Sequence, residues 1–185
     1  MAKILEKLNS AVLSGAVLVL LALILLHRND LAGWAFWGPF FTFLHVLSGV
    51  VWIGLLYYFN LVQIPTMPKV PAELKPGVSK FIAPEALFWF RWGAASTVVT
   101  GLIVFFSGTA VSTPTIQIGM LLGLIMAFNV WFIIWPNQKK ALGLVEADDA
   151  TKAKSARIAM LTSRTNFVLS LPMLYCMVMQ GGVPV

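Results

Sequence analysis

The sequence predicts an all-α protein: a polytopic transmembrane helical bundle of about five spans, forming one domain over residues 1–185. Three observations support this. First, 59% of the residues are hydrophobic and only 11% are charged, which leaves a soluble domain of this size too little polar surface. Second, the apolar residues gather in stretches close to the roughly 20 residues that a span needs. Third, the basic residues fall in alternate connections between these stretches.

The basic residues also predict the orientation. Alternate connections hold nearly all of them, and the other connections hold only Arg28. Because positive loops stay in the cytoplasm, we expect a bacterial inner (cytoplasmic) membrane protein with a cytoplasmic N-terminus and a periplasmic C-terminus. This rule accounts for the net charge of +6, so no nucleic acid partner is expected, and the basic loops are expected to contact membrane lipids. The residues concerned are Lys3, Lys7, Lys69, Lys75, Lys80, Lys139, Lys140, Lys152, Lys154, Arg157 and Arg164.

The first span is expected at residues 11–27, where no small-residue cleavage site follows. It is interpreted as a retained span, with a signal peptide as the alternative. The second is expected at 36–60, with aromatic residues at both ends, as in an interfacial belt. In the linker 61–86 that follows, five prolines argue against a continuous helix. We expect this linker to lie along the cytoplasmic surface.

The third span is expected at residues 87–108 and the fourth at 116–135, joined by the uncharged turn TAVSTPT. Pro136 ends the fourth span and opens a second cytoplasmic linker, 137–164. In this linker two aspartates precede the basic residues, an order that complements a helix macrodipole. It therefore predicts a cytoplasmic helix that leads into the fifth span, at 165–182.

Small residues spaced four apart predict close helix packing on the third and fourth spans. Gly93, Thr97 and Gly101 form such a stripe on the third span, and Gly119 and Gly123 form a G-x-x-x-G on the fourth. Small side chains let helix backbones approach each other where lipid provides no hydrophobic drive. Because the loop between the two spans is short, we expect them to contact each other in antiparallel fashion.

The two histidines are the first candidates for cofactor binding. His45 lies roughly two turns inside the second span from the outer face, and His27 ends the first span at that face. Two imidazoles at one depth are able to ligate a b-type haem axially. The alternative is that His27 is interfacial and that His45 forms a hydrogen bond with a neighbouring helix.

A second candidate site uses sulfur. Met173, Cys176 and Met177 lie in the outer half of the fifth span, and with His45 they would form a soft copper site. The alternative is that these side chains provide adaptable packing. Because Cys176 is the only cysteine, the sequence has neither a disulfide framework nor a CxxCH haem attachment string.

Other polar residues in the spans predict packing or surface contacts. Arg91 is expected to snorkel to the cytoplasmic interface, with Glu85 or a lipid headgroup as the alternative partner. Asn129 and Asn166 are expected to form interhelical hydrogen bonds worth about 1 kcal/mol or less. Contacts with lipid or a partner chain are expected from Arg91, Trp131, Trp135 and Arg164.

The sequence contains no constellation typical of an independent enzyme. It has no pair of carboxylates within the spans, no serine nucleophile with a base, no phosphate-binding loop and no zinc-ligand spacing. We therefore expect no catalytic activity from this chain alone.

Four strings together resemble the membrane domain of the bacterial cytochrome-linked urate hydroxylases, the PuuD-like family. They are HVLSGVVWIGLLYYFN (45–60), FRWGA (90–94), NVWFIIWPNQKK (129–140) and SRTNFVLSLPML (163–174). The resemblance matches His45 to the histidine that opens the H-x-x-x-G-x-x-W-I-G string of the family. The other matched residues are Gly49, Trp52, Gly54, Asn129, Trp131, Trp135, Pro136, Asn137, Ser163, Arg164, Asn166 and Pro172.

The resemblance implies the fold of a short stand-alone relative and a connection with membrane redox complexes. That family is regarded as an oxidative membrane domain that passes electrons to a fused cytochrome c. The present chain is shorter than the full membrane domain and carries no cytochrome c module. Urate oxidation itself is therefore not expected.

Three functions follow from these observations. The first is a non-catalytic accessory or structural subunit of a larger membrane complex, with an oxidoreductase as the expected partner. The alternative is an electron-transfer protein that binds haem b through His45. A second alternative is a small oligomeric transporter, against which the odd number of expected spans and the lack of a charged pathway argue.

Overall fold

The computed structural model describes residues 5–27, 33–110 and 112–179, and these residues form helices and connections without a strand. The expected all-helical class is thereby confirmed for the part of the chain that is described. The chain divides into two compact units, residues 1–40 and residues 41–185.

The first unit contains α2 (Leu8–His27) and the first turns of α3 (Trp34–Tyr57). α2 is apolar on all sides and buries none of its residues within the protein. A helix of this kind finds its apolar surroundings in a membrane. At the start of α3, the ring of Phe36 stacks on that of Phe40 at 5.9 Å and meets Trp37 edge-on at 5.2 Å.

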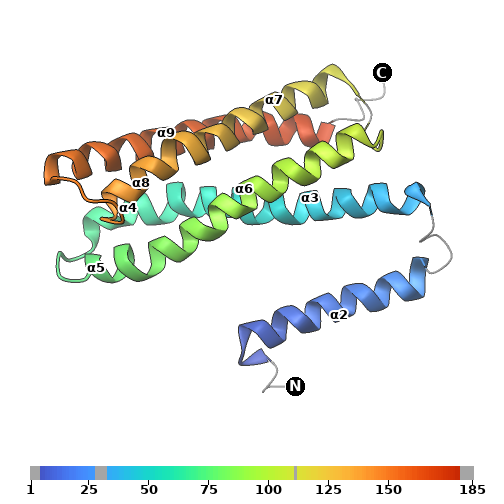
Figure 1. Cartoon of the computed structure of the whole chain (residues 1–185), viewed down its shortest axis with the longest axis horizontal. Coiled ribbons are helices and arrows are strands. Elements are labelled where there is room, and N and C mark those ends of the chain that lie inside the picture. The colour runs from blue at the N-terminus through green and yellow to red at the C-terminus, as the bar shows by residue number, and fades with distance from the viewer. Residues whose placement is uncertain (1–4, 28–32, 111, 180–185) are drawn as a thin grey trace. The chain divides into compact units, whose positions relative to one another are not determined.

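The second unit consists of four long helical stretches joined by short connections (Figure 1). The first is α3 with η1 (Tyr58–Gln63), α4 (Ile64–Thr66) and η2 (Met67–Lys69), and the second is α5 (Lys75–Gly77), η3 (Val78–Ile82) and α6 (Ala83–Phe106). The third is α7 (Pro114–Phe128), η4 (Asn129–Ile134) and α8 (Trp135–Ala141), and the fourth is α9 (Asp149–Val178).

Glycines at two helix crossings bring these stretches together. Figure 1 shows α9 alongside α7 and α8, and α6 crossing α3. A Cβ atom added at Gly93 of α6 would lie 3.2 Å from the backbone nitrogen of Trp52 in α3, and one at Gly119 of α7 would lie 2.9 Å from Cβ of Cys176 in α9. The small residues on α6 and α7 thus contact α3 and α9 rather than each other. A Cβ atom added at Gly123 would meet no neighbouring atom within 4 Å.

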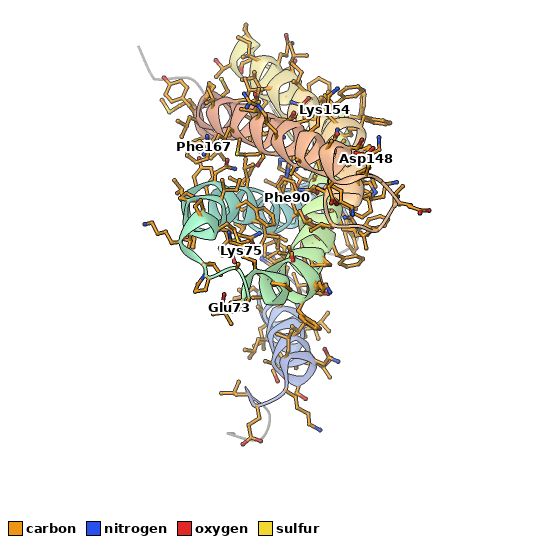
Figure 2. The ribbon with its side chains drawn as sticks, turned by 90° about the vertical axis from the view of Figure 1, so that its left-hand side faces the viewer. Glu73, Lys75, Phe90, Asp148, Lys154 and Phe167 are labelled. Carbon is orange, nitrogen blue, oxygen red and sulfur yellow. The ribbon has the colours of Figure 1, made fainter. Side chains whose placement is uncertain are left out.

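The core of the second unit lies where the four stretches meet. Phe90 of α6 points between the helices, as Figure 2 shows, and its ring meets Phe59 edge-on at 5.7 Å. The largest fully buried apolar side chains of the described residues are Trp52, Leu56, Phe90, Met126, Val130 and Ile134.

Three π-helical segments, η1, η3 and η4, interrupt the α-helical pattern, and each one precedes a proline. Proline has no N–H group, and its ring presses against the carbonyl four residues earlier in a regular helix. The wider π-turn moves that carbonyl away, so the helix continues past the proline. The last residue of each segment and its proline are Gln63 and Pro65, Ile82 and Pro84, and Ile134 and Pro136.

α9 is a single helix of 30 residues that turns a face of small and polar residues toward its neighbours. It begins after Asp148, whose carboxylate accepts a hydrogen bond of 2.6 Å from the backbone N–H of Thr151. The cytoplasmic helix and fifth span expected from the sequence are therefore one continuous element. Its buried residues are Ser155, Ala159, Ser163, Asn166, Ser170, Met173 and Cys176.

Four helical stretches are long and apolar enough to cross a membrane: Leu8–His27, Ala35–Lys69, Lys75–Phe106 and Pro114–Ala141. α9 is not among them, because its first half carries charged residues and its apolar second half is shorter than a span requires. The structure is thus compatible with a membrane protein. The fifth span at 165–182 and the orientation of the termini stay predictions, and residues 180–185 lie outside the described part.

The proline-rich segment differs from the expected linker 61–86. The first helical stretch continues to Lys69, the next begins at Lys75, and only residues 70–74 between them are not helical. The π-turns explain part of this difference. In addition, Pro76 lies in the first turn of α5, where a helical stretch begins and a missing N–H costs no helical hydrogen bond.

Candidate functional site

His45 of α3 is held by the backbone of α6. Its Nδ1 lies 2.9 Å from the carbonyl oxygen of Thr97. Because a carbonyl oxygen only accepts hydrogen bonds, Nδ1 must carry the proton and donate it. In the neutral imidazole, Nε2 then has a free lone pair and is able to accept a hydrogen bond or bind a metal. The structure thus assigns the tautomer that a histidine ligand needs.

The neighbourhood of His45 is shaped to keep the ring in place. Thr97 is buried, and its hydroxyl donates to the carbonyl oxygen of Gly93 at 2.7 Å. A Cβ atom added at Gly101, one turn further along α6, would lie 2.8 Å from Cε1 of His45. Glycine at this position therefore makes the space that the imidazole fills.

His45 lines a cavity of about 490 Å³ in the half of the second unit nearest the connection between α6 and α7. This volume lies within the range of about 300–1,000 Å³ that is typical of sites for small molecules and cofactors. The wall is almost entirely apolar and contains no charged side chain. The residues that could contact a ligand through a polar atom or sulfur include Thr42, His45, Tyr57, Thr97, Met120, Met173 and Met177.

The sulfur site expected from the sequence comes together only in part. Met173 and Met177 line the same cavity as His45. Cys176 is buried where α9 meets Gly119 of α7, and it does not line the cavity. Within residues 5–27, 33–110 and 112–179, no group of three histidine, cysteine or acidic side chains could hold a metal ion.

His27 lies in the first unit and ends α2. Its imidazole is exposed, with its centroid 5.6 Å from that of the Phe36 ring. A haem held by both histidines stays a prediction.

A line of buried polar contacts joins α9 to the other helices. Nδ2 of Asn129 donates to Oδ1 of Asn166 at 2.8 Å, and Nδ2 of Asn166 donates to the carbonyl oxygen of Met126 at 2.9 Å. Asn129 and Asn166 thus form the interhelical hydrogen bonds that the sequence suggested. Toward the cavity, the hydroxyl of Ser170 donates to that of Tyr57 at 3.1 Å.

Sequence reasoning missed Tyr57, Ser163 and Ser170 as part of this line. Nδ2 of Asn60 donates to the hydroxyl of Ser163 at 2.9 Å, at the opposite end of the line from the cavity. The signal was present, since Ser163, Asn166 and Ser170 follow one another at the three- and four-residue spacing of a single helix face.

Arg91 occupies the opposite end of the second unit from the cavity. Its Cζ lies 3.4 Å from the centroid of the Trp135 ring, a cation–π contact. The carboxylate of Glu85 is not its partner, because Glu85 accepts a hydrogen bond of 2.9 Å from the indole of Trp89. Trp131 meets the ring of Trp92 edge-on at 5.6 Å, and Arg164 is exposed on α9.

Residues 106–181 match the model of a family described as urate oxidase N-terminal. The match covers α7, η4, α8 and α9, including the pair formed by Asn129 and Asn166, and it does not extend to His45. The expected resemblance to the urate hydroxylase membrane domain is thus confirmed over these residues. No curated protein and no solved structure matches the chain.

Proposed function

We propose that this chain is an electron-transfer subunit of a membrane oxidoreductase, and that its cavity holds a b-type haem whose iron Nε2 of His45 would bind. The observation that carries the proposal is the hydrogen bond from Nδ1 of His45 to the carbonyl of Thr97. Ligating histidines are typically oriented in this way, by a hydrogen bond from the second ring nitrogen to a carbonyl or carboxylate. When bound, a haem supplies one-electron transfer.

The residues around the cavity fit a haem in two respects. The apolar wall suits the faces of a macrocycle, and a thioether of Met120, Met173 or Met177 would be able to bind the iron together with His45. The wall contains no charged side chain, so partners for the propionates have to lie outside it.

The chain acts within a larger complex in this proposal, because its residues form no catalytic constellation of their own. The match of residues 106–181 to a urate oxidase N-terminal family supports a redox setting. A bacterial inner membrane with basic connections in the cytoplasm is the proposed location, which the four apolar helical stretches support. The competing function is a purely structural subunit. That function gives no role to Nε2 of His45, whose lone pair is left available by the hydrogen bond from Nδ1 to Thr97.

The test is a reduced-minus-oxidised visible spectrum of the full chain, expressed with added haem precursor and purified gently through a tag. We expect a b-type band in the natural protein and its loss in His45→Gln. His27→Gln tests the other expected ligand: loss of the band would make His27 a haem ligand, and a retained band would exclude it. Circular dichroism verifies that each variant is folded.

Two results would overturn the haem assignment. One is a colourless natural protein, and the other is a folded His45→Gln variant with full haem content. If the colourless protein instead contained copper in metal analysis, the cavity would be a metal site. If it contained neither and co-purified with larger subunits at fixed stoichiometry, the chain would be a structural subunit.

A further inference from the structure

The guanidinium of Arg91 has no anionic partner among the residues that the structure describes. It lies on the face of Trp135, and its Nη1 atom is buried without a hydrogen-bond partner. The acid nearest in sequence, Glu85, is bound to Trp89 instead. Buried donors in folded proteins nearly always have a partner, in the protein or outside it. Nη1 of Arg91 therefore has no hydrogen-bond acceptor among the described residues in their present arrangement.

Besides Nη1 of Arg91, four buried side-chain atoms of the described residues have no hydrogen-bond partner: the indole Nε1 of Trp52, which lines the cavity, and three amide oxygens. The amide oxygens are Oδ1 of Asn60, Oε1 of Gln63 and Oε1 of Gln138. An amide oxygen accepts hydrogen bonds and cannot donate them, so each requires a donor. Nη1 of Arg91 thus lacks an acceptor, and the three amide oxygens lack donors.

The contacts place these atoms at one end of the second unit. The rings of Phe59 and Phe90, next to Asn60 and Arg91, are 5.7 Å apart. Arg91 touches Trp135, which lies one helical turn before Gln138. Because side chains tilt toward the N-terminus of their own helix, Arg91 extends toward the end where α6 begins.

A second cation lies beside Arg91. Nζ of Lys139 lies 5.6 Å from the centroid of the same Trp135 ring, so two cations share one indole. Figure 2 looks onto this end, with Lys75 before α6, and Asp148 and Lys154 at the start of α9. Among the described residues, the one ion pair that forms here joins Lys152 to Asp149 at the start of α9 and leaves Arg91 and Lys139 unneutralised.

We propose that Arg91, Lys139 and Gln138 bind a phosphate-bearing group that carries its own hydroxyl or ammonium donor. Phosphate oxygens accept from the guanidinium of Arg91 in a charge-assisted hydrogen bond. The hydroxyl or ammonium donates to the orphan oxygen of Gln138. A phospholipid headgroup has this chemistry, and so does a free phosphate with its hydration water. The site is remote from the cavity, and the proposal does not depend on haem binding.

The first experiment measures phospholipid that stays bound to the full chain in mild detergent, by native mass spectrometry. Arg91→Gln is expected to weaken lipid binding by about tenfold or more, the effect of losing a hydrogen bond to a charged group. Arg164→Gln measures what a surface charge alone contributes, because it removes the same charge from an exposed position that is expected to contact lipid but has no orphan atoms. Gln138→Leu is the second variant, and it is expected to weaken binding while leaving Arg91 on Trp135.

The second experiment separates the two sources of phosphate. Delipidated protein is titrated with inorganic phosphate, and in parallel reconstituted into nanodiscs of phosphatidylglycerol or phosphatidylcholine, with Trp fluorescence as the readout. A response only to phosphatidylglycerol, lost in Arg91→Gln, identifies a lipid headgroup; a response to inorganic phosphate identifies a soluble ligand. The proposal is overturned if Arg91→Gln and Gln138→Leu both match Arg164→Gln in every assay.

Discussion

The imidazole of His45 and the backbone of Gly101 are in contact across the interface between α3 and α6. A methyl group on Gly101 would lie 2.8 Å from Cε1 and 3.0 Å from Nδ1 of the ring, closer than real Cβ atoms approach a neighbour. The glycine therefore fixes how deeply the ring enters α6, and with it the hydrogen bond to Thr97. Any cofactor held by His45 depends on this contact.

Gly101→Ala is expected to displace the His45 ring and to lower the haem content of the purified chain. Overpacking of a well-packed site also costs typically about 1–3 kcal/mol, so the unfolding temperature should fall. Gly77→Ala is the control, since a Cβ atom there meets nothing within 4 Å and Gly77 does not line the cavity. The difference spectrum and thermal unfolding measure the two effects. Natural haem content and stability in Gly101→Ala would refute the contact.

Gly119→Ala should weaken the packing of α7 on α9, whereas Gly123→Ala in the same helix should not. The added methyl would lie 2.9 Å from Cβ of Cys176 at the first position and meets nothing within 4 Å at the second. Thermal unfolding followed by circular dichroism should show the difference. Cys176→Gly should restore stability in the Gly119→Ala background, and equal losses in both alanine variants would contradict the close approach.

The pair formed by Asn129 and Asn166 should show coupling in a double-mutant cycle. Asn166→Ala removes two hydrogen bonds and leaves the amide of Asn129 without its acceptor, which costs about 1–3 kcal/mol. The coupling energy with Asn129→Ala should be about 1 kcal/mol, the usual scale for hydrogen bonds between membrane helices. Reversible unfolding in mixed micelles provides the four free energies. Additive losses would mean that the two amides act independently.

Asp148 should make the stability of α9 depend on pH. Hydrogen bonds from the backbone N–H and then the hydroxyl of Thr151 hold the pKa of its carboxyl below the ordinary value. A carboxyl whose pKa is lower in the folded state adds to the free energy of unfolding. This contribution is complete above the unfolded pKa of about 3.9, and it is lost as the pH falls through the folded pKa.

Asp148→Ala should therefore be less stable than the natural chain at neutral pH, and this gap should narrow below about pH 4. Asp148→Asn should recover part of the loss, because its side-chain oxygen still caps the helix but does not titrate in this range. Thermal unfolding at several pH values measures all three chains. A gap that stays constant with pH would show that the charge of Asp148 is irrelevant.

Topology is tested by reporter fusions. Alkaline phosphatase fused after Val185, or in the uncharged connection near Ala110, should be active, because both points are expected in the periplasm. A fusion after Leu142 should be inactive, and a fluorescent protein at that point should be bright. A cytoplasmic signal after Val185 would refute five spans and leave α9 outside the membrane.

Much of the fold follows from apolar runs and their end signals. The turn between α6 and α7 is an example: the hydroxyl of Thr113 accepts from the backbone N–H of Ile116, and Pro114 occupies the first turn of α7. Both residue types favour a helix start, so the start of the fourth helix was predictable to within two residues, whereas its predicted end at Pro136 was wrong because the helix continues to Ala141. The helices that continue past Pro65, Pro84 and Pro136 were not, because π-turns have no signal in hydrophobic periodicity.

The residues of the candidate site could be predicted from the sequence, but their arrangement in space could not. His45 stood out because a histidine within a span is rare. Its hydrogen bond to Thr97 joins two helices that are far apart in sequence, so nothing local predicted the tautomer. Arg91 was expected to reach the interface or Glu85. It stacks on Trp135, which only the fold brings near, and Glu85 binds Trp89; its reach to the membrane interface or to a lipid headgroup stays a prediction.

The three π-turns ahead of prolines have a consequence for how the two ends of the second unit are built. A π-turn is equivalent to one residue inserted into an α-helix, and one residue rotates a helical face by about 100°. In the stretch α7–η4–α8, η4 thus allows Met120 to line the cavity and Gln138 to lie near Arg91, at the opposite end of the second unit. η4 lies between the two sites on its stretch, and shortening it by one residue would misdirect one site while leaving the other intact.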